Sequence, residues 1–116
     1  MTTALENILT PAAEITIGAK TFKMVFDFVA VAEVEEKTGR NLLSQEGWEY
    51  LSGRDISLVF WATLQAYHQE LTLTAVRRLM NSKNIELVTN KIKEAWTLSK
   101  PEVVEADTAD KPADPQ

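Results

Sequence analysis

An alternating stretch near the start of the chain, EITIGAKTFKMVF (residues 14–26), restricts the fold more than any other feature. Apolar residues repeat with a period of two on both sides of Gly18, at Ile15 and Ile17 and then at Phe22, Met24 and Phe26. Gly18 can adopt the positive φ that a tight connection needs, so the pattern predicts a β-hairpin. Because an isolated two-stranded hairpin is marginal in water, its apolar face must be covered by other elements.

The residues that follow have a helical period and can supply this cover. Asp27 is a good N-cap and Gly39 a good C-terminal stop, which predicts a helix over 28–38. At 100° per residue, one broad apolar face is expected to hold Phe28, Val31, Ala32 and Val34. Phe26 and Val31 are spaced as a hydrophobic staple.

Three further helices are expected, each after a capping residue. Their predicted N-caps are Asp55, Thr72 and Asn84, and their predicted ends lie near residues 69, 80 and 98. The first of them is apolar most of the way round, so it should be central in the domain or be buried against a partner. We therefore expect an α+β fold, a single domain over 13–99 with a hairpin packed on four or five helices.

The two ends of the chain are expected to lie outside this domain. Residues 1–12 hold a short apolar stretch, ALENIL, that Pro11 stops, and we interpret them as a flexible segment. Residues 100–116 read as a disordered acidic tail. Five acids and one base from Pro101 onward give −4 of the net charge of −5, so the other 100 residues carry only −1. With no cysteine, no signal peptide and no membrane-length apolar run, the composition fits a cytoplasmic protein.

Three carboxylates close together raise the question of a catalytic or metal site. Glu33 and Glu36 fall on the polar side of the predicted helix, and Glu33 is spaced to pair with Lys37. Glu35 falls near the middle of the apolar face, where a raised pKa and acid–base chemistry remain an alternative. We favour a structural role, with Glu35 bonded to a neighbouring loop or to an arginine such as Arg40 or Arg54.

Other signs of a catalytic, metal-binding or phosphate-binding site are weak. The only histidine, His68, has no thiol or acid at ligand spacing, and no phosphate-binding glycine motif is present. We therefore predict no enzyme activity, no metal and no cofactor. Bases gather in the last two helices at Arg77, Arg78, Lys83, Lys91 and Lys93, which keeps a helix-turn-helix DNA-binding regulator as an alternative. Glu86 and Glu94 are interleaved with them and the body is nearly neutral, which argues against nucleic acid as a partner.

Large aromatic residues are numerous for so small a core. We expect at least one of Trp48, Tyr50, Trp61 and Trp96 to contact a partner protein, since tryptophan and tyrosine dominate protein interfaces. Structural roles are expected for Asp27, Glu35, Gly39, Asp55 and Thr72. Apolar surface beyond what one helix layer hides also suggests a small homo-oligomer.

The order of these parts resembles the small phage tail assembly chaperones of tailed phages and gene transfer agents. In that family a hairpin with an I-x-x-G-K-like turn precedes a phenylalanine, an E-x-E-E-x-x-G segment and paired leucines. The matching residues are Ile17, Lys20, Phe22, Phe28, Glu33, Glu35, Glu36, Gly39, Leu42 and Leu43, followed by Trp61, Leu71 and Thr72. The resemblance covers residues 13–98 and departs in the last helix, which is more basic than the family pattern.

The resemblance implies a non-catalytic protein of the host cytoplasm that is absent from the finished virion. It would bind the long, hydrophobic tape measure protein, keep it soluble and help to bring tail tube subunits to it. A structural tail component is a further alternative.

Overall fold

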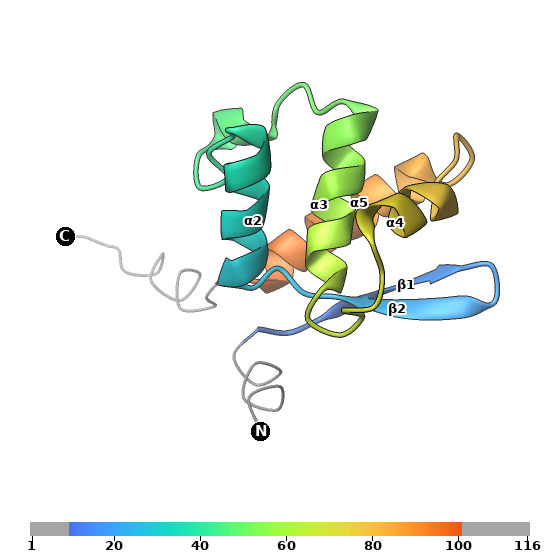
Figure 1. Ribbon diagram of the computed structural model, residues 1–116. Helices are drawn as coiled ribbons and strands as arrows, with labels where there is room; N and C mark the ends of the chain where they lie inside the picture. The colour runs from blue at the N-terminus through green and yellow to red at the C-terminus, as the bar shows by residue number, and fades with distance from the viewer. Residues whose placement is uncertain (1–9, 101–116) are drawn as a thin grey trace.

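The computed structural model describes residues 10–100 and has an α+β fold in that range (Figure 1). A two-stranded hairpin comes first and is followed by four α-helices and one short 3-10 helix. The elements are β1 (Ala13–Ile17), β2 (Lys20–Met24), α2 (Phe28–Thr38), η1 (Gln45–Trp48), α3 (Gly53–Leu64), α4 (Leu73–Leu79) and α5 (Ile85–Leu98). The predicted fold class is confirmed. The expected flexible segment and acidic tail lie largely outside the described residues.

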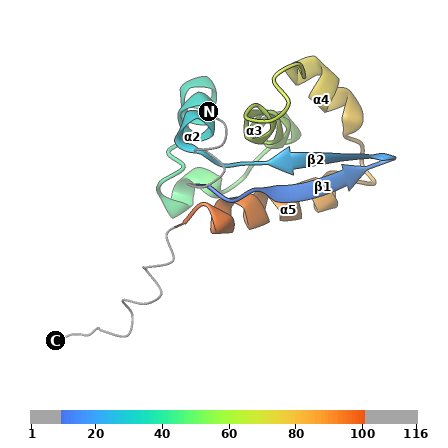
Figure 2. The same ribbon diagram turned by 90° about the horizontal axis from the view of Figure 1, so that it is seen from below.

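The hairpin forms as the alternating pattern predicts. Gly18 has φ of 64°, and the antiparallel register pairs Ile17 with Lys20 and Ile15 with Phe22. Helix α5 contacts β1 and α3 contacts β2, so the helices cover the sheet (Figure 2). The outer edge of β2 is closed as well. The backbone N–H of Lys23 donates to Nε2 of His68 at 3.0 Å, and that of Val25 donates to the carbonyl of Thr63 at 2.8 Å.

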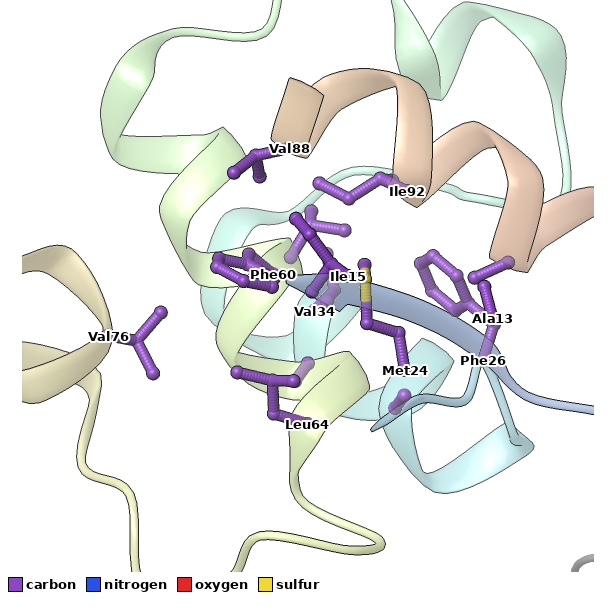
Figure 3. Packing of buried hydrophobic residues seen from close by; sticks show 14 of the residues in the cluster. Ala13, Ile15, Met24, Phe26, Val34, Phe60, Leu64, Val76, Val88 and Ile92 are labelled. Carbon is purple, nitrogen blue, oxygen red and sulfur yellow. The ribbon is translucent and has the colours of Figure 1, made fainter. Parts of the chain in front are cut away.

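Helix α3 is the centre of the domain, as its nearly encircling apolar residues predict. It contacts α2, α4, α5 and β2, and eight of its residues are buried. Phe60 is fully buried and lies in one cluster with Ile15 of β1 and Val34 of α2 (Figure 3). Val88 and Ile92 bring α5 into the same core.

Helix α2 begins and ends where the sequence predicts, and two of the four residues expected on its apolar face, Val31 and Val34, are buried. Asp27 Oδ1 accepts a hydrogen bond from the Ala30 N–H at 2.9 Å, and Gly39 closes the helix with φ of 77°. The buried residues are Ala30, Val31 and Val34, whereas the expected Phe28 and Ala32 are exposed. The small side chain of Ala30 allows the helix to rest on α3 through this face, which turns Phe28 away from the core.

The three glutamates of α2 have separate surroundings. Glu33 forms an ion pair of 3.0 Å with Lys37, and Glu36 is exposed. Glu35 Oε2 accepts a hydrogen bond of 3.0 Å from the backbone N–H of Leu42. The expected bond of Glu35 to a neighbouring loop is confirmed, and it ties α2 to the start of the loop that follows the helix.

The starts of the later helices agree with the sequence at two of three positions. Thr72 caps α4 by accepting from the Ala75 N–H at 3.0 Å. Asn84 precedes α5, but its side chain accepts from the Asn81 N–H and donates to the carbonyl of Leu79, so it holds the turn instead of the helix.

The prediction that Asp55 is an N-cap is wrong. Ser52 is the N-cap of α3, and its hydroxyl accepts from the Asp55 N–H at 3.2 Å. The helix therefore starts three residues earlier than expected, and it ends at Leu64 instead of near residue 69. Asp55 lies inside the first turn with its side chain 7% exposed, because that carboxylate is bound by Arg40.

Arg40 connects α3 to the loop of residues 41–52. Its Nε and Nη2 lie 3.1 and 3.0 Å from Asp55 Oδ2. Its guanidinium also donates to three carbonyls, those of Gly47, Glu49 and Tyr50, at 3.1, 2.7 and 2.9 Å. A guanidinium has five N–H donors in a fixed plane, so one side chain can hold this whole turn of backbone.

Arg40→Ala is expected to destabilise the domain by roughly 3 kcal/mol, because it leaves a buried carboxylate and three carbonyls without their donor. Arg54→Ala is the matched control. Arg54 also approaches Asp55, at 3.5 Å, but its side chain is 79% exposed, so a loss below about 1 kcal/mol is expected. Urea unfolding of both variants measures the difference. Equal losses would contradict the role given to Arg40.

Candidate protein-interaction surface

The loop of residues 41–52 places Trp48 against the domain. Trp48 ends the short helix η1, and its indole N–H donates to the carbonyl of Leu42 at 3.0 Å. Gly47 is buried beside it, and a Cβ at that position would lie 1.9 Å from the carbonyl oxygen of Asn41. The loop therefore depends on a close backbone approach that only glycine allows at residue 47.

Three aromatic rings from distant parts of the sequence meet at this point. The ring of Phe26 lies 5.7 Å from that of Trp48 and 5.1 Å from that of Trp96, both edge to face. The two indoles lie 5.0 Å apart and are tilted by 51°. Phe26 is buried and both tryptophans are half-buried. The cluster therefore has one side in the core and another at the surface.

A cavity of about 780 Å³, here called the larger pocket, opens beside this cluster. Its apolar lining includes Phe26, Phe28, Leu42, Leu43, Trp48 and Trp96. Phe28 is 73% exposed and Leu43 is 68% exposed, although both are large apolar side chains. Its volume is in the range of ligand-binding pockets, and exposed apolar side chains that gather at one cavity are typical of an interaction site.

A second cavity of about 340 Å³, the smaller pocket, also uses the tryptophan pair. Trp48 and Trp96 line it together with Leu51, Ile56 and Ile92. Because the same two indoles line both cavities, they form a shared wall between the larger and the smaller pocket. A partner that crosses this wall could place one apolar side chain on each side of it.

The four aromatic residues predicted to contact a partner do not form one site. The structure brings Trp48 and Trp96 together, but Trp61 and Tyr50 line neither pocket. The Trp61 indole donates to the carbonyl of Leu71 at 3.2 Å and packs against the core from α3. Tyr50 is 92% exposed and has φ of 59°, an uncommon conformation for tyrosine that Arg40 holds through the Tyr50 carbonyl.

Two residues of the larger pocket were missed from the sequence. The sequence predicts Phe28 on the buried face of its helix, since its spacing to Val31 and Ala32 is typical of a core pattern. Leu43 stands out in the sequence only as one of a leucine pair. Leu42 of that pair is buried whereas Leu43 is exposed, and the loop that contains both has no repeating pattern that predicts this difference.

A third cavity, of about 500 Å³, lies between the start of α3 and the turn from α4 to α5. Arg54 and Arg77 line it, but the guanidinium of Arg77 already forms hydrogen bonds within the domain. Its Nε donates to Ser57 Oγ at 2.8 Å, and its Nη2 to the carbonyl of Arg54 at 3.4 Å. Lys91, another of the bases considered for DNA binding, forms an ion pair of 3.1 Å with Glu94.

His68 has a structural position. Besides accepting from the Lys23 N–H, its ring lies 5.3 Å from that of Phe22, nearly perpendicular to it. Within residues 10–100 there is no group of three or more histidine, cysteine or acidic side chains placed to hold a metal ion. In the same range, no helix has the length and apolar character needed to cross a membrane.

Gly47→Ala is expected to destabilise the domain by roughly 2 kcal/mol, because the added methyl group overlaps the Asn41 carbonyl and forces the loop to move. The fluorescence of the tryptophans should change with it as Trp48 leaves its position. Gly53→Ala is the matched control: a Cβ there meets nothing within 4 Å, so stability should stay equal or rise by about 0.4–1 kcal/mol. Thermal unfolding of both variants tests this, and an undisturbed Gly47→Ala protein would contradict the loop geometry.

Comparisons of the chain with protein-family models, with curated proteins and with solved structures found no significant match. The resemblance to tail assembly chaperones therefore rests on the order of the residues quoted above. The structure adds an apolar surface at which two cavities share the Trp48 and Trp96 side chains.

Proposed function

We propose that this protein is a non-catalytic binding protein that holds an apolar helical segment of a partner in the larger pocket. One observation carries the proposal. Phe28 and Leu43 are left exposed at a cavity whose wall is the Trp48–Trp96 pair. Full burial of each of these side chains would contribute about 1.5–3 kcal/mol, and a partner that covers them would supply this burial.

The form of the surface favours a helical segment. Amphipathic helices bind in apolar grooves through anchors spaced three or four residues apart. The larger and the smaller pocket lie on the two sides of the tryptophan wall, so two successive anchors can enter separate cavities. Tryptophan is among the residues that contribute most to interface energies.

By its resemblance to tail assembly chaperones, we propose the tape measure protein as the partner. That protein is long and apolar, and a chaperone that covers its apolar segments one at a time would keep it soluble until tail tube subunits assemble around it. Binding of the tape measure protein would take place in the host cytoplasm, and the chaperone would not remain in the virion. A structural tail component would use the same surface permanently, and its presence in purified virions would distinguish the two roles.

The DNA-binding alternative has less support. Arg77 joins α4 to α3, and Lys91 is paired with Glu94, so two of the bases counted for it already have partners within the domain. A stripe of free bases along one helix would be expected for a DNA-reading surface. We therefore do not propose it as the function.

The proposal is tested by co-expression with the tape measure protein of the same genome, followed by pull-down. Phe28→Ser and Leu43→Ser are each expected to weaken binding about tenfold or more, corresponding to a loss of about 1.4 kcal/mol or more. Both side chains are already exposed, so circular dichroism and unfolding curves should change little.

Two matched controls separate the pocket from general surface hydrophobicity. Val29 is 69% exposed on the same helix as Phe28 and does not line the pocket, and Leu87 is 41% exposed on α5. Val29→Ser and Leu87→Ser should leave binding unchanged. If all four variants bind equally well, or if the tape measure protein precipitates regardless of co-expression, the proposed function is wrong.

A further inference from the structure

Both ends of the described range lie at the larger pocket. Thr10 lines it at one end of the range, and Ser99 and Lys100 line it at the other. Residues 1–9 and 101–116 therefore both start from its rim. Any apolar side chain in the first few positions beyond either end is held close to an open apolar cavity, at the high effective concentration that a short tether gives.

The two adjoining segments differ in what they offer to such a cavity. The first reads MTTALENIL, and its Leu5, Ile8 and Leu9 are spaced i, i+3 and i+4, so in a helical turn they share one face. The second, PEVVEADTADKPADPQ, has two valines as its only large aliphatic residues and carries five acids. The first segment is the better match to a pocket lined by phenylalanine, leucine and tryptophan.

We propose that residues 5–9 occupy the larger pocket of the same molecule when no partner is bound. This inference rests on the proposed function, because it makes the segment a built-in competitor of the partner helix. Leu9 adjoins Thr10 of the lining, and Leu5 lies five residues from Thr10, which an extended chain spans in at most about 18 Å.

Charge at the rim does not oppose this occupant, since Asp27 and Lys100 both line the pocket and their charges balance. Lys100 lines the pocket with its Nζ 5.8 Å from the Trp96 ring. In residues 5–9, Glu6 is the one charged residue, and in a helical turn it falls off the face that holds the three aliphatic side chains. The segment can therefore bury its apolar face beside the tryptophans while its carboxylate stays near the ammonium group of Lys100.

Such an occupant regulates binding. A partner reaches the pocket only in the fraction of molecules in which the segment has left it, so the apparent affinity falls by that fraction. The same contact covers Phe28 and Leu43 in the free protein, which limits unwanted association through these exposed side chains.

The test uses the full chain labelled with 5-fluorotryptophan, with no partner present. The double variant Leu5→Ser/Ile8→Ser is expected to shift the fluorine resonances of Trp48 and Trp96, because both indoles line the pocket. The Trp61 resonance is the internal reference for an intact fold, since that indole contacts Leu71 instead. Val103→Ser/Val104→Ser is the matched control from the other segment and should shift none of the three.

Unchanged Trp48 and Trp96 resonances in the Leu5→Ser/Ile8→Ser protein would overturn the proposal, as would a shift caused by the valine variant instead. Because this readout needs no partner, the proposal about residues 5–9 can fail while the proposed partner binding holds. The proposed partner binding can likewise fail while the proposal about residues 5–9 holds. In the pull-down with the tape measure protein, the Leu5→Ser/Ile8→Ser protein should bind severalfold more tightly. Equal or weaker binding would overturn the competition between the segment and the partner.

Discussion

The ion pair between Arg40 and Asp55 is the interaction on which the candidate surface depends. It joins the residue after the stop of α2 to the first turn of α3, and the same guanidinium binds the carbonyls of Gly47, Glu49 and Tyr50. A loop of residues 41–52 with only one turn of 3-10 helix would otherwise have few fixed contacts. With Arg40 in place, Trp48 has one position, against Phe26 and Trp96.

The core and the candidate site therefore share residues. Phe26 ends the hairpin segment in the core, while its ring forms part of the aromatic cluster that lines the larger pocket. The rotation of α2 that buries Ala30, Val31 and Val34 is also what presents Phe28 to solvent. The domain would be more stable if it covered Phe28 and Leu43 itself. Their exposure is best understood if another segment or a partner covers them during function.

The sequence predicts the elements well where the signal is local. Alternation and Gly18 specify the hairpin, and Asp27, Gly39 and Thr72 specify helix ends, since each acts on backbone within a few residues. It fails where a side chain acts at long range. Asp55 has the chemistry of an N-cap, but a half-buried arginine 15 residues earlier competes for its carboxylate, and Ser52 caps the helix instead. Likewise, no local pattern shows that Trp48 and Trp96 meet whereas Trp61 contacts Leu71.

If the larger pocket receives a partner segment, backbone amides around it should be protected in the complex. Hydrogen–deuterium exchange of the protein, free and in complex with the tape measure protein, measures this protection. Exchange should be slower in the complex at residues 26–31, 42–48 and 96–100, which line or adjoin the pocket. Slower exchange confined to residues 53–57 and 77–85, around the arginine-lined cavity, or no change at the larger pocket, would contradict this binding.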